Sequence, residues 1–304
     1  MICYVSQYAG FCFGVSLAVD AAYESYSSGA CMLGEVVHNP SVVRDLESRG
    51  MRRVSDPEQI RPGEKALIRA HGVGEDVINR LRDLSIPVID RTCPKVKRIH
   101  DIVRRATASG NRVVIAGNRS HPEVIGTMGW CAGAVVLETT SDAQEYAEAH
   151  SSEGAEICLV SQTTFNKKKY GEIRDILEAG GVKLIYHDTI CLDTSDRQRE
   201  TSEYSKKVDC VIIVGGMNSS NSTKLYEIAR SNCKAMHVES AYGMDIGEVV
   251  RLNAVFITGG ASTPIENVAL AVDTLKNACR EAGVPFELYA QGRAALFFEP
   301  VALR

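Results

Sequence analysis

The sequence has few of the features that mark membrane, secreted or nucleic-acid-binding proteins. No apolar run approaches the roughly 18 residues that span a bilayer. The chain has 34 lysines and arginines against 38 acidic residues, and this net charge of −4 argues against nucleic acid as a partner. Its first residues, MICYVSQYAGFCFGV, lack a basic start and are interrupted by glycine, so we expect no signal peptide. We therefore expect a cytoplasmic protein with no membrane partner.

Several common site motifs are also missing. The ten cysteines include no C-x2-C pair, so nothing local supports a zinc finger or a ferredoxin-type run. No G-x4-G-K-[ST] loop is present, and no G-x-G-x-x-G follows a predicted strand, so nucleotide folds of those kinds are not indicated. Without a secretory signal, the cysteines are expected to be free thiols rather than a disulfide framework.

One local pattern recurs along the 304 residues: an apolar run, a short polar or glycine-rich corner, and then a segment with helical periodicity. It occurs at residues 66–84, 112–128, 157–177, 210–230 and 254–275. Strands that alternate with helices predict an α/β fold with mostly parallel sheets and right-handed crossovers. Ligands of such sheets bind beyond the carboxyl ends of the strands, where these corners lie.

Three corners carry cysteine. Cys12, Cys93 and Cys191 each stand just ahead of a predicted helix, where the backbone dipole lowers the pKa of a thiol. They are 81 and 98 residues apart, which suggests three similar α/β units that each deliver one thiolate to a common centre. We place these units at about 13–93, 94–187 and 188–277, with segments 1–12 and 278–304 packed onto them. The seven other cysteines are expected to pack in cores: Cys3, Cys31, Cys131, Cys158, Cys210, Cys233 and Cys279.

Three histidines occupy comparable corners. His38 precedes Asn39-Pro40, a typical helix start, His71 precedes a glycine, and His121 precedes Pro122. An imidazole at such a corner can donate a hydrogen bond to an anion that the helix N-terminus attracts. The corners 217–223 and 259–263 add hydroxyl and amide groups that cap helices or bind an oxyanion. Their candidate side chains are Ser219, Ser220, Asn221 and Ser262.

These residues stand in motifs that resemble a known family. The motifs are GFCFGV, EVVHNPSVV, AHGV, DRTCPKV, GNRSHPEVIGTMG, SQTTF, DTIC followed by SDRQ, GGMNSSNSTKL and TGGASTP. They run through nearly the whole chain, which resembles the IspH (LytB) family of 4-hydroxy-3-methylbut-2-enyl diphosphate reductases. The resemblance implies three pseudo-symmetric α/β units in a trefoil arrangement around an oxygen-sensitive [4Fe-4S] cluster.

The resemblance also implies roles for the corner residues. Cys12, Cys93 and Cys191 would hold the cluster, whose fourth iron stays open for the substrate. Glu123 and Thr163 would sit by the allylic hydroxyl, with Glu123 in the proton path. The implied reaction is a two-electron reductive dehydroxylation to isopentenyl and dimethylallyl diphosphate, the last step of the non-mevalonate (MEP) isoprenoid route. The diphosphate would be held by His38, His71, His121, Ser219, Ser220, Asn221 and Ser262.

The basic runs at 94–98 and 167–169 are typical of solvated helix faces. The resemblance adds a second interpretation, the docking of an acidic electron donor, ferredoxin or flavodoxin. Two features are unexpected in this setting: the acidic residues Asp193 and Asp196 close to Cys191, and Trp130 with Cys131 soon after Glu123.

Three alternatives stay open on these residues. One is another three-cysteine [4Fe-4S] enzyme of the quinolinate synthase type, which the histidine and NSSNS motifs disfavour. Another is a zinc protein that uses three cysteines to bind or hydrolyse a phosphorylated ligand. The third is a sensor that binds the diphosphate without converting it.

Overall fold

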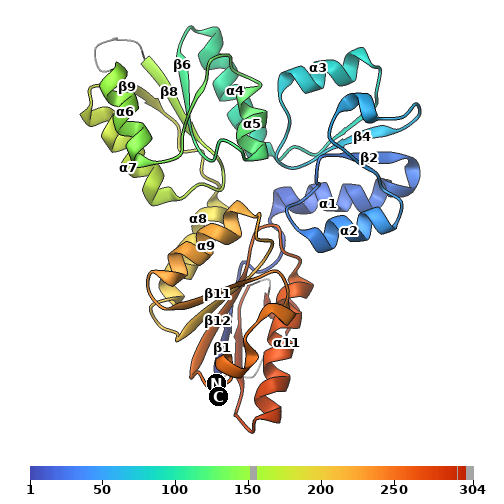
Figure 1. The fold of residues 1–304 in the computed structure, drawn as a ribbon, viewed down its shortest axis with the longest axis vertical. Coiled ribbons are helices and arrows are strands. Elements are labelled where there is room, and N and C mark those ends of the chain that lie inside the picture. The colour runs from blue at the N-terminus through green and yellow to red at the C-terminus, as the bar shows by residue number, and fades with distance from the viewer. Residues whose placement is uncertain (151–155, 293, 299–304) are drawn as a thin grey trace. The chain divides into compact units, whose positions relative to one another are not determined.

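The computed structural model describes residues 1–150, 156–292 and 294–298 (Figure 1). These residues form three β-sheets, and all the strand pairings that they make are parallel. The chain divides into two compact units. The terminal unit comprises Met1–Phe13, His38–Pro40 and Leu192–Arg304, and the middle unit comprises Gly14–Val37 and Ser41–Cys191. The three-way division at residues 93 and 187 remains a prediction.

The terminal unit is built on a five-stranded sheet in the order β11-β10-β12-β1-β13. The first strand of the chain lies inside this sheet, where Ile2 is in register with Ala254 on one side and Glu287 on the other. The strands are β1 (Ile2–Val5), β10 (Cys210–Val214), β11 (Lys234–Val238), β12 (Ala254–Gly259) and β13 (Glu287–Ala290). The helices are α8 (Leu192–Tyr204), α9 (Ser220–Arg230), α10 (Ile246–Val249) and α11 (Ile265–Glu281), with short 3-10 turns at Ala241–Gly243 and Ala294–Leu296.

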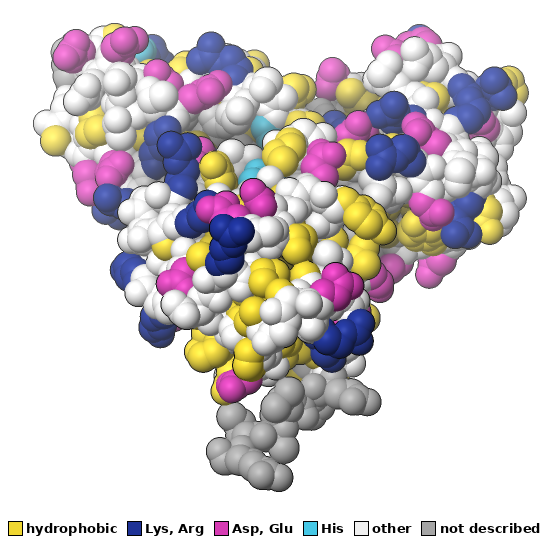
Figure 2. Space-filling model, turned by 60° about the horizontal axis from the view of Figure 1, so that its bottom comes forward, with side chains coloured by type: hydrophobic (Ala, Val, Ile, Leu, Met, Phe, Trp, Pro, Cys, Tyr) yellow, Lys and Arg dark blue, Asp and Glu magenta, His cyan; other side chains and the backbone are white. Residues whose placement is uncertain are grey.

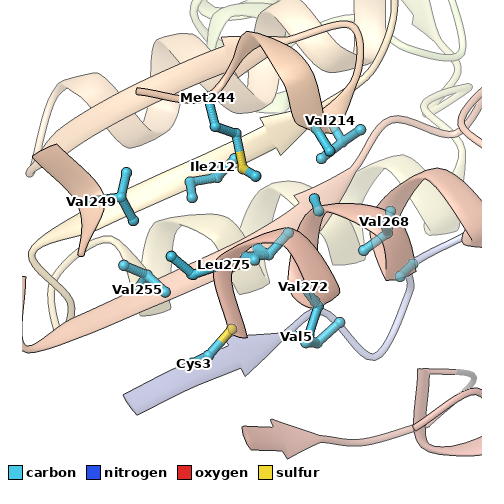
Figure 3. Close-up of a cluster of buried hydrophobic side chains, with 14 of the residues drawn as sticks. Cys3, Val5, Ile212, Val214, Met244, Val249, Val255, Val268, Val272 and Leu275 are labelled. Atoms are coloured by element: carbon cyan, nitrogen blue, oxygen red, sulfur yellow. The ribbon is translucent and has the colours of Figure 1, made fainter. Parts of the chain in front are cut away.

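The central strands β10 and β12 of this sheet are buried along nearly their whole length, which explains their almost continuously apolar sequences. Because successive side chains of a strand point to opposite faces, Ile212 and Val214 pack with Leu275 and other side chains of α11, as Figure 3 shows. Ile213 of the same strand packs with Leu225 of α9 on the opposite face.

The middle unit contains two four-stranded sheets, in the orders β3-β2-β4-β5 and β7-β6-β8-β9. The first sheet consists of β2 (Ala30–Leu33), β3 (Arg53–Val54), β4 (Lys65–Ile68) and β5 (Val88–Asp90), and the second of β6 (Arg112–Ala116), β7 (Val135–Leu137), β8 (Glu156–Ser161) and β9 (Lys183–Tyr186). The helices are α1 (Phe13–Ser25), α2 (Pro40–Ser48), α3 (Glu75–Asp83), α4 (Pro94–Ala108), α5 (Pro122–Met128), α6 (Thr140–His150) and α7 (Lys167–Ala179), with 3-10 turns at Tyr26–Ser28 and Pro57–Gln59.

The five predicted strand-corner-helix segments are confirmed: β4–α3, β6–α5, β8–α7, β10–α9 and β12–α11 follow them in order. His38 lies farther from its strand than the pattern suggested. β2 ends at Leu33 because Gly34 takes a φ of +78°, a left-handed conformation that suits glycine, and bends lead from there to α2.

Charges of both signs are interspersed over the face drawn in Figure 2, with hydrophobic side chains between them. Among the described residues, no helix is both long enough and apolar enough to cross a bilayer.

Candidate functional site

The three corner cysteines stand where the sequence pattern places them, at the starts of helices. Cys12 precedes α1, Cys93 caps α4 with Pro94 at its first position, and Cys191 precedes α8. All three are half-buried, and none forms a disulfide. Six of the seven cysteines assigned to packing are buried, and Cys233 alone among them is half-buried. The corner thiols are therefore more accessible than the thiols of the cores.

Glu123 is the most unusual acid of the middle unit. Its side chain is only 2% exposed in the first turn of α5, and both carboxylate oxygens are bonded to Thr163. The Thr163 amide donates to Oε1 at 2.6 Å, and the Thr163 hydroxyl donates to Oε2 at 2.7 Å. Burial raises the pKa of Glu123 to about 7, against the lowering effect of these two hydrogen bonds. The carboxyl group can therefore carry a proton at neutral pH and release it.

Two of the corner cysteines, Cys93 and Cys191, lie near Glu123 and Thr163. The Cys191 amide donates to the Thr163 carbonyl at 3.0 Å. Burial raises the pKa of Cys93 and outweighs the lowering by hydrogen bonds from the Lys95 and Val96 backbone at the helix start, while Cys191 and Glu123 raise it further. The lowered pKa that the sequence predicted for this corner thiol is therefore wrong. A Cβ atom on residue 14 would lie 2.6 Å from Sγ of Cys93, so this thiol has room only because residue 14 is glycine.

Two imidazoles lie side by side in the middle unit. His71 and His121 meet edge to face, with ring centroids 5.2 Å apart. His121 caps α5, and its Nδ1 accepts a hydrogen bond from the Glu123 amide at 3.2 Å. Since Nδ1 is the acceptor, the proton of the neutral ring is on Nε2, which can donate to an anion.

The corner after His71 is held by Trp130, one of the residues whose role the sequence left open. The Trp130 indole donates to the Val73 carbonyl at 2.9 Å and stacks on His100 with centroids 5.2 Å apart. Burial lowers the pKa of His100 to about 4, so this ring is neutral at physiological pH. Gly72 has a φ of +70°, and a Cβ there would lie 2.8 Å from His100. Trp130 and His100 thus support the loop that carries His71.

The terminal unit gathers the predicted hydroxyl and amide groups. Ser219 caps α9, and the Ser262 hydroxyl donates to the Ser219 hydroxyl at 3.1 Å. The Asn39 amide donates to the Ser262 carbonyl at 3.2 Å, which brings the segment of His38 to the same place. Asn221 is 3% exposed, and neither polar atom of its amide has a hydrogen-bond partner among the described residues. These groups cluster at the N-terminus of α9, which suits an oxyanion.

The third corner cysteine joins this group. The Cys12 amide donates to the Ala261 carbonyl at 3.1 Å, one residue before Ser262. The middle unit therefore assembles Cys93, Cys191, His71, His121, Glu123 and Thr163, and the terminal unit assembles Cys12, His38, Ser219, Ser220, Asn221 and Ser262. The convergence of all three thiols at one centre stays a prediction.

Arg197 was missed in the sequence, where it resembles one more charge on a polar helix. It is fully buried, and it pairs with Asp193 at 2.7 Å. The i,i+4 spacing of this acid and base was the available signal. The second unexpected acid, Asp196, pairs with Arg199 at 2.8 Å, so each of the two acids has a basic partner on α8.

The two basic runs differ in how many of their charges are paired with an acidic side chain or lie over an aromatic ring. In α7, Lys167 pairs with Asp188, Lys168 pairs with Glu172, and Lys169 lies over the Phe165 ring. In α4, Lys97 pairs with Asp90 and Arg104 pairs with Asp101. Three further bases of α4 or its start are exposed and have no acidic partner in the described chain: Lys95, Arg98 and Arg105.

Comparison with known proteins bears on the whole chain. Residues 3–276 match the model of the family described as LytB protein. The chain is 37% identical over 283 residues to the 4-hydroxy-3-methylbut-2-enyl diphosphate reductase of Thermoanaerobacter sp. (strain X514), covering 90% of this chain and 96% of that protein. It is 35% identical over 277 residues to the protein of that name from Clostridioides difficile (strain 630), covering 89% and 99%.

Two solved structures are similar to this one. The E-1-hydroxy-2-methyl-but-2-enyl-4-diphosphate reductase from Plasmodium falciparum superposes with a TM-score of 0.86 at 24% identity, covering 99% of this chain and 94% of that chain. An (E)-4-hydroxy-3-methyl-but-2-enyl diphosphate reductase, described as the terminal enzyme of the non-mevalonate pathway, gives 0.65 at 34% identity, covering 91% and 100%. These likenesses confirm the predicted α/β fold with three parallel sheets.

Proposed function

Because the chain belongs to the LytB protein family, we propose that it reduces (E)-4-hydroxy-3-methylbut-2-enyl diphosphate to isopentenyl and dimethylallyl diphosphate. This is the terminal step of the non-mevalonate isoprenoid route, and the chain is an oxidoreductase. The carbon–oxygen bond of the allylic alcohol breaks, two electrons and two protons enter, and the oxygen leaves as water. The observation that carries the proposal is Glu123, a buried acid titrating near neutrality beside Cys93 and Cys191.

The thiols support a [4Fe-4S] cluster as the cofactor. Cys12, Cys93 and Cys191 are half-buried thiols at helix starts and form no disulfide, and the glycine at residue 14 leaves room at Cys93. Three such ligands suit a cluster with one iron that has no protein ligand. When bound, the cluster would supply the electrons and a Lewis-acidic position for the substrate hydroxyl. None of the ten cysteines forms a disulfide, which agrees with an enzyme of the reducing cytoplasm.

The candidate imidazoles, hydroxyls and amide would bind the diphosphate. Nε2 of His121 can donate, and Asn221 and Ser219 lie at the N-terminus of α9. A micromolar ligand requires about 8 kcal/mol of binding free energy. Hydrogen bonds to a charged group contribute about 1.5–3 kcal/mol each, so a handful of these donors is sufficient.

Glu123 would supply the proton that turns the hydroxyl into water. Its pKa of about 7 leaves about half of the carboxyl groups protonated at neutral pH, which suits a general acid. The two bonds from Thr163 fix the carboxyl plane and stabilise the carboxylate that remains after transfer. The negative diphosphate, when bound nearby, would favour the protonated acid.

The electron donor would be an acidic protein of the ferredoxin or flavodoxin kind, and α4 is the better docking surface. This helix begins at Cys93, and three of its exposed bases have no acidic partner in the described chain. The lysines of α7 are already engaged with acids or with a ring. Complementary charge mainly speeds encounter and orients the partner.

The decisive experiment is an anaerobic assay with the allylic diphosphate and a low-potential reductant, with iron, sulfide and zinc measured in the same sample. We expect brown protein with about four irons and sulfides per chain and turnover that depends on the reductant. Cys93→Ser should lose cluster iron, whereas Cys233→Ser, at a half-buried thiol outside the proposed site, should keep it.

Each alternative gives a different result in this assay. Turnover without any reductant would favour a dehydrating lyase of the quinolinate synthase type. Colourless protein with one zinc would favour the phospho-ligand zinc protein. Tight binding of the diphosphate without product would favour the sensor.

A further inference from the structure

Arg197 is a buried cation that the reaction scheme does not use. Its guanidinium makes three hydrogen bonds inside the terminal unit. Nε donates to Asp193 at 2.7 Å, Nη1 donates to the Gly259 carbonyl at 2.9 Å, and Nη2 donates to the Gly10 carbonyl at 2.9 Å. A fully buried charge is tolerated only when it is paired and hydrogen-bonded. Asp193 supplies the counter-charge, and the planar fork of the guanidinium reaches both carbonyls at once.

The two carbonyls belong to the backbone segments that carry proposed ligands. Gly10 lies two residues before Cys12 and has a φ of +97°, so the chain turns sharply there. Gly259 ends β12 and opens the corner that contains Ser262. The Cys12 amide also bonds the Ala261 carbonyl of this corner. Arg197 therefore ties the segment of Cys12 to the corner of Ser262.

A second side chain of α8 holds the same segment. Glu200, one turn after Arg197, accepts hydrogen bonds from the Ser6 hydroxyl and from the Gln7 amide, the latter at 3.0 Å. Side chains of α8 thus hold segment 6–10 at both ends. Several polar side chains of this helix are buried, which is unusual for a helix with so polar a sequence.

We propose that Arg197, held by Asp193, is a positioning residue that presents Cys12 to the cluster and Ser262 to the diphosphate. The inference rests on the proposed function, since it takes Cys12 as a metal ligand and Ser262 as a diphosphate ligand. It also gives Asp193 a role: the acid next to Cys191 maintains the arginine that orders two other parts of the site. Outer groups that orient ligands commonly affect metal affinity by about 10–100-fold.

The test compares three variants purified anaerobically. Asp193→Asn keeps the shape of the acid but removes the charge that holds Nε. Arg197→Lys keeps the positive charge but places all its donors on one nitrogen, so it loses the planar fork whose three nitrogens reach the acid and the two carbonyls. Asp196→Asn is the matched control, because it removes one negative charge from the same helix but pairs only with exposed Arg199. The measurements are the rate of iron loss to a chelator and the calorimetric Kd for inorganic diphosphate.

We expect Asp193→Asn and Arg197→Lys to lose iron about tenfold faster and to bind diphosphate about tenfold more weakly, with Asp196→Asn unchanged. Iron retention and Kd at wild-type values in Asp193→Asn would overturn the proposal, even if its melting temperature fell. Equal effects of Asp193→Asn and Asp196→Asn would also overturn it, because net charge would then explain both. If Arg197→Lys does not fold, Asp193→Asn decides.

The two proposals fail separately. Wild-type protein that retains iron and binds diphosphate but does not reduce the allylic substrate would end the proposed function and leave this inference standing. Active wild-type protein, together with an Asp193→Asn variant whose iron retention and diphosphate Kd are unchanged, would end this inference and leave the proposed function standing.

Discussion

Sγ of Cys93 lies 2.6 Å from the point that a Cβ atom on Gly14 would occupy, and Cβ of Cys93 lies 2.9 Å from it. Real Cβ atoms do not approach other atoms so closely. The first turn of α1 can therefore pack against the start of α4 only because residue 14 is glycine. A single added methyl group would displace the thiol.

Gly14→Ala is therefore expected to reduce the iron content of the anaerobically purified protein to a minor fraction. Gly171→Ala is the matched control, since Gly171 lies within α7 with no atom near the position of its added Cβ. That control should keep its iron and gain up to about 1 kcal/mol of stability from the better helix former. Full iron occupancy in Gly14→Ala would contradict the assignment of Cys93.

The pH dependence of turnover should report the titration of Glu123. As the pH rises through about 7 the acid loses its proton, so kcat/KM should fall about tenfold per pH unit above that point. Thr163→Val removes one donor to the carboxylate, which should raise the pKa of Glu123 and move the falling limb upward by about one pH unit. Glu123→Gln should retain iron and diphosphate binding but lose turnover. If the falling limb of the kcat/KM profile lies at the same pH in Thr163→Val, a group other than Glu123 is responsible for it.

The same raised pKa affects folding. The unfolded carboxyl ionises near 4.5, whereas the folded one stays protonated up to about 7, so the native state loses stability as the pH rises between these values. The penalty reaches about 3 kcal/mol above pH 7. Apoprotein carrying Glu123→Gln should thus gain stability relative to wild type between pH 4 and pH 8, which denaturant titrations can measure.

Asn221 should affect binding and stability in opposite directions. Its buried amide has no partner in the described chain, and an unsatisfied buried polar group costs about 1–3 kcal/mol. Asn221→Ala should therefore raise the melting temperature of the free protein. It should also weaken the binding of inorganic diphosphate about tenfold. Asn232→Ala is a suitable control, because that amide is already bonded to Ser205 and Ile228. Unchanged diphosphate affinity in Asn221→Ala would remove Asn221 from the anion site.

The donor surface can be tested by charge reversal. Arg98→Glu with Arg105→Glu on α4 should lower the rate supported by an acidic protein donor about tenfold at low salt, and less at high salt. The rate with a small chemical reductant should not change, because no docking is needed. Lys168→Glu with Lys169→Glu on α7 serves as the comparison. If only the α7 pair slows the protein donor, docking occurs there instead.

The fold and the local setting of the site were predictable from the sequence because they depend on short-range chemistry. Apolar runs such as 112–116 are buried strands, and a polar corner followed by Pro122 begins a helix. The approach of Glu123 to Thr163 was not predictable in this way. It joins residues 40 positions apart, and only the family resemblance placed both at one hydroxyl.

Arg197 shows why other parts of the site could not be predicted. The stretch RQRE has the composition of a solvated helix face. The i,i+4 spacing from Asp193 indicates an ion pair, but it does not distinguish a buried guanidinium from an exposed one. Its burial follows from acceptors nearly two hundred residues away at Gly10 and 62 residues away at Gly259. Likewise, the strand before His38 ended early because of the backbone at Gly34, which sequence periodicity does not reveal.

The position of β1 inside the sheet of the terminal unit limits the order in which the parts of this protein can fold. Ile2 has neighbours at Ala254 and Glu287, so β1 cannot take its place in the sheet until strands that follow it by about 250 residues or more have been made. The middle unit, by contrast, is nearly continuous in sequence and can fold during synthesis. Long-range pairing of this kind is slow, since a large loop must close first. Cys12 therefore reaches its final position late, and iron delivered to a nascent chain would find only the thiols of the middle unit in place.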